Sequence, residues 1–159
     1  MPIAVPPVSW PRRQRLDPVG GGYLDKQGRR AAFFTLPMPP SANNMFINTG
    51  RGRARSEAYN AWINEAGWEL RRQRVPKLKG RVRVNIRLER PSVGKADVDN
   101  RIKPVLDLLQ TMGVLTDDSL VWDVRAVWAA QNSGKKTVQG ARVGVVEMDA
   151  PVDAAAPKK

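Results

Sequence analysis

Apolar and polar residues alternate along the segment 81–90, strictly so from residue 81 to residue 89. Val82, Val84, Ile86 and Leu88 alternate there with polar positions, three of which are arginines. Alternate residues of a β-strand project to opposite faces, so this pattern predicts a strand with one buried face and one solvated face. Three further strands, bounded by residues typical of turns, are predicted at 31–36, 120–129 and 141–148.

Two other segments repeat their apolar residues every three or four positions, which predicts helices. The first follows Ser56, a residue suited to an N-cap, and ends in the basic residues 71–74 before Pro76. The second runs from Asp99 to about Met112. The apolar positions are Tyr59, Trp62, Ile63, Ala66 and Leu70 in the first helix, and Ile102, Val105, Leu106 and Leu109 in the second.

These elements follow one another in the order β-α-β-α-β-β. This order predicts an α+β fold, a single small domain in which two helices pack on a mixed β-sheet. Residues 1–30 mix prolines, glycines and basic residues without a period, which is typical of an extended or disordered arm. We therefore expect a basic N-terminal arm at 1–30, a folded domain at 31–148 and a flexible C-terminal tail at 149–159.

The 159-residue chain is strongly basic, with 27 Lys and Arg against 15 Asp and Glu and a formal net charge of +12. Residues 1–90 hold 18 basic and 6 acidic side chains, whereas residues 91–159 hold 9 of each. Such a field attracts polyanions such as nucleic acids. An acidic membrane surface or an acidic protein would be attracted as well, so charge alone does not choose the partner.

The chain contains neither cysteine nor histidine. This excludes disulfides, thiolate metal sites, imidazole bases and histidine-ligated zinc. Any metal must be bound by oxygen ligands, which suit Mg²⁺, Mn²⁺ or Ca²⁺. No apolar run approaches the roughly 20 residues of a membrane span, and no apolar signal core opens the chain. We expect a cytoplasmic protein without a membrane partner.

Six Asp and no Glu lie in the segment 97–123. Asp97 and Asp99 are two residues apart, and in an extended segment they would project to the same side and converge on one cation. Asp117 and Asp118 precede a predicted strand, so one of them would complete a carboxylate cage if that strand lies beside the first pair. Taken singly, each aspartate also has an ordinary role in a helix cap, a loop or a turn.

A divalent ion in such a cage would support hydrolysis of a phosphodiester. It keeps coordination positions for water and a phosphate oxygen, lowers the pKa of the water and neutralises charge on the reacting phosphate. Lys103 lies one helical turn after Asp99 and would reach that phosphate. It also lies four residues before Asp107, where a surface ion pair is the simpler interpretation.

Arginines are concentrated at two further places. The segment 48–55, predicted as a flexible loop, carries them at alternate positions, and the strand 81–90 carries them on its polar face. Arginine matches the geometry of phosphate, but a half-buried strand also needs a solvated face, so both interpretations stand for the strand. The candidate phosphate-binding residues are Arg51, Arg53 and Arg55 in the loop, and Arg81, Arg83 and Arg87 on the strand.

Two stretches together carry a more specific pattern. From Asp97 the chain reads D-x-D-N-x-x-K, followed by D-x-L, a glycine at 113 and D-D-x-x-V at 117–121. Upstream, residues 36–43 read L-P-x-P-P-S-x-N. This combination resembles the core of the RusA-type Holliday-junction resolvases, and the matches span the predicted domain.

The resemblance implies a homodimeric, metal-dependent endodeoxyribonuclease that resolves four-way DNA junctions by paired symmetric nicks in recombination and repair. It implies Mg²⁺ as the cofactor, with Mn²⁺ as a substitute. It also implies a cytoplasmic, nucleoid-associated protein, with the origin of the gene left open between a bacterium, a prophage and a phage. By position, the metal-binding carboxylates would be Asp97, Asp99 and Asp118, the essential lysine Lys103, and the supporting residues Asn100, Asp107 and Asp117.

The pattern also departs from the family at one position. The residue before the first carboxylate, often basic in relatives, is Ala96 here, with Lys95 one step earlier. We therefore count Lys95 among the expected DNA-binding residues. Three alternatives remain open: a less selective branched-DNA or flap nuclease, a non-catalytic basic DNA-binding module, and a protein that binds an acidic partner surface.

Overall fold

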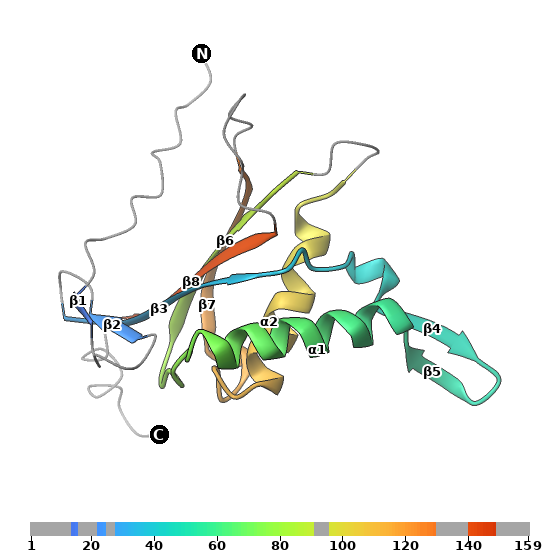
Figure 1. Ribbon diagram of the computed structural model, residues 1–159, viewed down its shortest axis with the longest axis horizontal. Coiled ribbons are helices and arrows are strands. Elements are labelled where there is room, and N and C mark those ends of the chain that lie inside the picture. Colours follow the sequence, from blue (N-terminus) through green and yellow to red (C-terminus); the bar gives the residue numbers. More distant parts are fainter. Residues whose placement is uncertain (1–13, 16–21, 25–27, 91–95, 130–139, 149–159) are drawn as a thin grey trace, which may run out of the picture.

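One six-stranded sheet forms the centre of the molecule (Figure 1). The computed structural model describes residues 14–15, 22–24, 28–90, 96–129 and 140–148. Every pair of neighbouring strands is antiparallel except β6 and β7, which are parallel. In spatial order the strands are β1 (Gln14–Arg15), β2 (Gly22–Leu24), β3 (Arg30–Leu36), β8 (Ala141–Glu147), β6 (Val82–Leu88) and β7 (Val121–Trp128).

Two helices, α1 (Glu57–Arg72) and α2 (Ile102–Thr111), pack on one face of this sheet. Three 3₁₀ turns and a separate hairpin complete the described chain. The main elements follow the order β3-α1-β6-α2-β7-β8, which confirms the predicted α+β class with a mixed sheet and two helices. The remaining elements are η1 (Ala42–Asn44), η2 (Asp99–Arg101), η3 (Asp118–Leu120), β4 (Phe46–Thr49) and β5 (Gly52–Arg55).

Two short strands were not predicted from the sequence. β1 and β2 lie inside the segment expected to form an extended or disordered arm, and they add to the β3 side of the sheet. Each has only two or three residues, too few for a period to be visible in the sequence. β2 pairs with β3 and β1 pairs with β2, and the local sequence reveals neither pairing.

The core lies between the helices and the inner face of the sheet, and the alternation of β6 builds its centre. Val82, Val84, Ile86 and Leu88 are at most 1% exposed. Burying one such side chain contributes about 1.5–3 kcal/mol to stability. Most of the predicted apolar positions belong to the same cluster: Tyr59, Trp62, Ala66 and Leu70 from α1, and Val105 and Leu109 from α2. The predicted Ile63, Ile102 and Leu106 are only partly buried against it, and Leu108, which was not predicted, is buried in it.

Hydrogen bonds hold α1 at both of its ends. Ser56 is the N-cap, as predicted, and its Oγ accepts the backbone N–H of Tyr59 at 3.1 Å. At the other end, the side chain of Gln73 accepts the N–H of Thr35 at 2.9 Å and donates to its carbonyl at 2.8 Å. Gln73 thus satisfies the backbone N–H and C=O of Thr35, a residue of β3 that lies beyond the part of β3 paired with β2.

The segment 48–55, predicted as a flexible loop, instead belongs to the β4–β5 hairpin. Figure 1 shows this hairpin projecting beyond the first turn of α1. Thr49 Oγ1 donates to the carbonyl of Gly52 at 2.8 Å and accepts the N–H of Arg51 at 3.2 Å, which closes the turn. Gly52 has φ of 110°, a conformation that favours glycine.

The register of the strands defines two ends of the sheet. Leu88 of β6 lies opposite Ala141 of β8, and Ala141 lies opposite Leu36 of β3. We call this the Leu88 end. At the other end of β6, Val82 lies opposite Val121 of β7, and we call this the Val82 end. β6 spans seven residues, so the two ends are about 20 Å apart.

No helix in the described ranges is long and apolar enough to span a membrane.

We predict that Gly140→Ala destabilises the fold by at least about 2 kcal/mol. Gly140 has φ of 107°, and a Cβ built there would lie 2.3 Å from the carbonyl oxygen of Leu36. Urea unfolding measures the effect. Gly50→Ala is the matched control, because a Cβ at Gly50 meets nothing within 4 Å. Equal stability of the two variants would contradict this account of the β3–β8 junction.

Candidate active site

Asp97 and Asp99 lie at the entrance to α2. Val98 between them has helical backbone angles, φ −65° and ψ −35°, and Asp99 is the first residue of η2. The expectation of an extended segment is therefore wrong, and the two-residue spacing does not by itself place both carboxylates on one side. Asp99 is not the N-cap of η2 either, since Val98 occupies that position without a side-chain hydrogen bond.

Both carboxylates are exposed and uncommitted. Neither Asp97 nor Asp99 has a side-chain hydrogen bond or ion pair with any residue that the structure describes. The chain has a net charge of +12, yet neither of these two acids is paired with a described basic side chain. Their oxygen atoms remain available to an external cation.

Arg101 fixes η2 in place. Its Nη1 donates to the carbonyl of Pro39 at 2.5 Å, and its Nε is buried without a hydrogen-bond partner among the described atoms. The bond ties η2 to the proline-rich segment after β3, where Ser41 caps η1 and η1 contacts η2. The upstream L-P-x-P-P-S-x-N stretch and the start of the D-x-D-N stretch therefore meet at the Leu88 end of the sheet.

Sequence reasoning did not identify Arg101 as a residue of this region. Its acceptor is a backbone carbonyl 62 residues earlier in the chain, and a carbonyl carries no residue-specific signal. Only the packing of η1 against η2 brings the donor and the acceptor together.

Asp117 and Asp118, although adjacent in sequence, have different environments. Asp117 is the N-cap of η3, and its Oδ1 accepts the backbone N–H of Ser119 at 3.1 Å. This hydrogen bond, followed by one with Asp118, lowers the pKa of the Asp117 carboxyl below its ordinary value. Asp118 is the first residue of η3 and is exposed. The cap occupies Asp117, which leaves Asp118 the better candidate for a ligand.

The structure places Asp118 far from the first two carboxylates. η3 leads directly into Val121 and so lies at the Val82 end, whereas Asp99 lies with η2 at the Leu88 end. β7 does pair beside β6, but the parallel register separates the two acidic groups by about the length of β6, roughly 20 Å. Within the described ranges, no three acidic side chains form a group that could hold a metal.

Lys103 pairs with Asp107, the ordinary interpretation of their spacing. Lys103 Nζ lies 3.2 Å from Asp107 Oδ1, and the lysine side chain is 62% exposed. An exposed pair of this kind contributes only a few tenths of a kcal/mol, so Lys103 exchanges partners easily. Asn100, in η2, has no side-chain hydrogen bond within the described part of the chain.

Asp107 also borders a hollow of about 400 Å³ between the hairpin and the two helices. Tyr59 lies in this hollow, and burial raises the pKa of its hydroxyl, an effect to which the Asp107 carboxylate adds and which Arg55 opposes. The residues lining the hollow are Phe46, Arg55, Tyr59, Asp107, Gln110 and Thr111.

The hairpin carries the three arginines predicted to bind phosphates. Arg51 lies in its turn and is exposed. The guanidinium of Arg53 stacks 4.2 Å from the ring centre of Phe46, and that of Arg55 lies 5.8 Å from that of Tyr59. Stacking holds a guanidinium by its face and leaves its N–H groups directed outward, so these arginines are positioned but still able to bind anions.

The three arginines on the polar side of the predicted strand 81–90 have three different environments; Arg83 and Arg87 lie in β6, and Arg81 directly precedes it. Arg81 stacks 4.1 Å above the ring of Trp122, and Arg83 forms an ion pair with Asp123 at 2.7 Å. Arg87 has no ion-pair partner among the described residues. The three positions therefore do not form one uniform phosphate-binding row. Lys95, the remaining predicted DNA contact, lies outside the described residues.

Comparison with known proteins agrees with the motif. The sequence profile of the family described as "Endodeoxyribonuclease RusA" matches residues 37–145. The crossover junction endodeoxyribonuclease RusA of Aquifex aeolicus (strain VF5) is 32% identical over 94 residues, which cover 58% of this chain and 73% of that protein. The crossover junction endodeoxyribonuclease rusA of Enterobacteria phage HK97 is 30% identical over 121 residues, which cover 70% and 89%.

The profile covers well over half of the chain, and both relatives are matched over more than two thirds of their length. The chain therefore belongs to the RusA family of endodeoxyribonucleases.

We predict that Asp117→Ala lowers the melting temperature at pH 7 and that this difference disappears in acid. A carboxyl whose pKa is lowered in the folded state contributes stability above its unfolded pKa, about 3.9 for Asp. That contribution is lost as the pH falls through the folded value. Thermal melts from pH 7 to pH 2 measure it.

The control for this experiment is Asp117→Asn, which keeps an N-cap acceptor but has no charge to titrate. It should melt close to the wild type at pH 7. A melting-temperature difference between Asp117→Ala and wild type that grows in acid would contradict the assignment.

Proposed function

We propose that the protein is a crossover junction endodeoxyribonuclease that resolves Holliday junctions as a Mg²⁺-dependent homodimer in DNA recombination and repair. The observation that carries the proposal is the pair of uncommitted carboxylates, Asp97 and Asp99, at the start of α2 in a family of endodeoxyribonucleases. The printed names of both relatives describe crossover junction endodeoxyribonucleases. The strong positive charge supports a DNA substrate.

The residues present fit a hard divalent cation, because Asp97, Asp99 and Asp118 supply only carboxylate oxygens. Mg²⁺ is the proposed ion, and Mn²⁺ should substitute for it. When bound, such an ion activates water and neutralises charge on the phosphodiester. The three aspartates would hold it, and the cap that engages Asp117 supports the choice of Asp118.

The separation of the two acidic groups bears on how such a site is assembled. One chain places Asp97 and Asp99 at the Leu88 end and Asp118 at the Val82 end, about 20 Å apart. We infer that each site combines Asp97 and Asp99 of one protomer with the partner's Asp118. A two-fold axis then creates two equivalent sites, which suits paired nicks in a nearly symmetric junction.

Other residues of the chain would hold and orient the substrate. Arg51, Arg53 and Arg55 on the projecting hairpin would contact the DNA backbone, which positions the junction without reading its sequence. Lys103 would leave its weak pair with Asp107 and donate to the phosphate at the cleavage point. Arg101 would act indirectly, by keeping η2 and its carboxylates against the Pro39 segment.

We predict that Asp97→Asn and Asp118→Asn each reduce cleavage of a synthetic four-way junction by at least about 100-fold with Mg²⁺ present. Mixing the two inactive proteins should restore part of the activity. In a mixed dimer with shared sites, one site carries both substitutions and the other carries none. About half of the dimers in an equal mixture would then have one intact site and nick one strand.

A single site assembled within each chain would give no recovery on mixing, which would contradict the shared site but not the nuclease. A mixture of Asp97→Asn with Asp99→Asn is the matched control, because both changes fall on the same side of the site and should not complement. Wild-type cleavage by either single variant would contradict the assignment. Equal cleavage of forks, flaps and linear duplex would identify a less selective branched-DNA nuclease.

Metal binding can be measured without DNA. We predict that Mn²⁺ at about 100 times its Kd stabilises the wild-type protein by about 2.7 kcal/mol, seen as a higher melting temperature. Asp97→Asn should lose this shift, whereas Asp123→Asn, a change in the ion pair with Arg83, should keep it. No Mn²⁺ response in the wild type would favour a non-catalytic DNA-binding module.

A further inference from the structure

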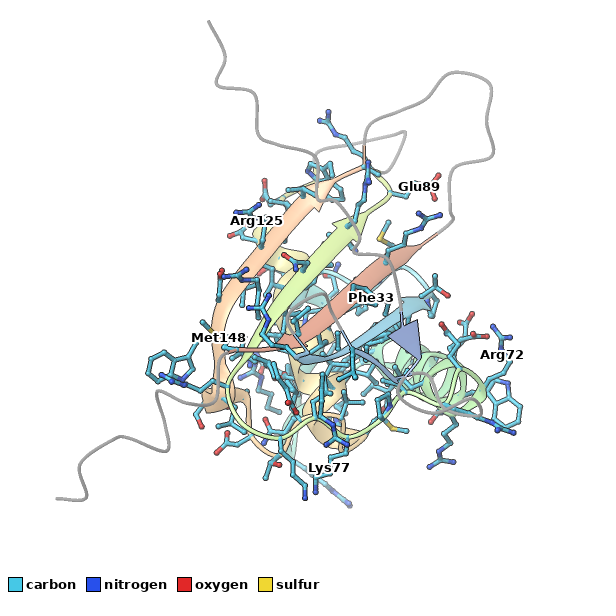
Figure 2. All side chains as sticks on the ribbon, turned by 90° about the vertical axis from the view of Figure 1, so that its left-hand side faces the viewer. Phe33, Arg72, Lys77, Glu89, Arg125 and Met148 are labelled. Atoms are coloured by element: carbon cyan, nitrogen blue, oxygen red, sulfur yellow. The ribbon has the colours of Figure 1, made fainter. Side chains whose placement is uncertain are left out.

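The face of the sheet opposite the helices, which we call the open face, carries a second group of arginines. Figure 2 looks onto this face, with the helices behind the strands and Arg125 and Phe33 labelled on it. The apolar residues of β6 point toward the helices, so its alternate polar residues point to this side. Cross-strand neighbours on the face follow directly from the strand register.

Cross-strand neighbours on this face form rows across the sheet. The charges cancel in the row that contains Arg83, but not in the rows closer to Leu88. Arg83 lies opposite Asp123 and forms an ion pair with it at 2.7 Å. Two rows further along β6, Arg87 lies directly opposite Arg142 of β8. Directly opposed residues in an antiparallel pair have Cβ atoms about 4.5–5.5 Å apart, and like charges there are destabilising.

Arg125 adds a third positive charge between these rows. It lies on β7 opposite Asn85, one row from Arg87 on the same face. Arg87, Arg125 and Arg142 make no ion pair with any described residue. Asp123, the acid in the neighbouring row, is paired with Arg83. The group therefore carries three positive charges that the described protein does not neutralise.

We propose that Arg87, Arg125 and Arg142 form a phosphate-binding patch on the open face that holds the backbone of one duplex arm of the DNA substrate. The proposal rests on the proposed function and extends it to a surface separate from the hairpin. A guanidinium binds phosphate through two parallel N–H donors, and a phosphate between two opposed arginines converts their repulsion into attraction.

The position of the patch also suits a substrate that must reach the carboxylates. Arg87 and Arg142 are each one residue from Leu88 and Ala141, so they lie at the Leu88 end of the sheet. Asp97 and Asp99 lie at the same end, where η2 is tied to Pro39. A duplex held on the open face is therefore directed toward the end of the sheet that carries the acidic pair.

The test compares two triple variants with the same change in net charge. R87Q/R125Q/R142Q removes the patch, and R71Q/K77Q/K79Q removes three exposed cations elsewhere. Binding of a labelled four-way junction and of a linear duplex is measured by fluorescence anisotropy in EDTA, over a range of salt concentrations. The patch variant should bind roughly 10- to 100-fold more weakly at 100 mM salt, with the salt slope reduced by about 2 to 3.

The control variant should keep a salt slope close to that of the wild type. Equal weakening of both variants would overturn the proposal, because it would reflect net charge rather than contacts. Loss of poly-glutamate binding without loss of DNA binding would also overturn it and would assign the patch to an acidic protein surface. If the wild type binds DNA through the patch but does not cleave junctions, the proposed function fails and the patch stands.

The melting temperature distinguishes a DNA-binding role of these arginines from a purely structural role. R142T replaces one of the opposed arginines with a residue that favours strands and relieves the repulsion. Its melting temperature should be unchanged or about 1–3 °C higher than that of the wild type, while its DNA binding weakens. A lower melting temperature with unchanged DNA binding would assign the arginines to folding and overturn the proposal.

Discussion

The pairing of β6 determines where most of the functional residues of this protein lie. β6 is the inner strand that pairs in parallel with β7 and in antiparallel with β8, and its apolar residues are almost completely buried. A shift of one residue would turn that apolar face to solvent, so the register is strongly specified. The same register sets the positions of η2 at one end of the sheet and η3 at the other.

The parallel pairing of β6 with β7 limits which carboxylates can share one site more strictly than the spacing of the motif does. A parallel pair requires a crossover that returns the chain to the starting end, and α2 supplies it. The carboxylates before the crossover and those after it must therefore lie at opposite ends of β6. A site that uses both groups then needs a second chain, so the dimer becomes part of the proposed catalytic unit.

The arginines of this basic protein have different roles. Some arginines make contacts within the fold: Arg83 forms an ion pair with Asp123, and Arg101 donates a hydrogen bond to the carbonyl of Pro39. Two others, Arg53 and Arg55 of the hairpin, lie over the aromatic rings of Phe46 and Tyr59. Arg87 and its neighbours on the open face have no described counter-charge. The net charge thus indicated a polyanion partner, but only the pairings distinguish structural arginines from those available to bind it.

The sequence by itself determined the main elements, the α+β class and the family, because apolar periodicity and a motif of fixed spacing are local properties. It did not reveal the short strands β1 and β2 or the hairpin, whose order depends on pairing and a turn. It also suggested an extended backbone at Asp97 and Asp99, where the packing of η2 imposes a helical one. The separation of Asp118, the capping role of Asp117 and the partner of Arg101 were decided by the tertiary structure. These depend on which distant segments become neighbours, and that follows from burial and register across the whole sheet.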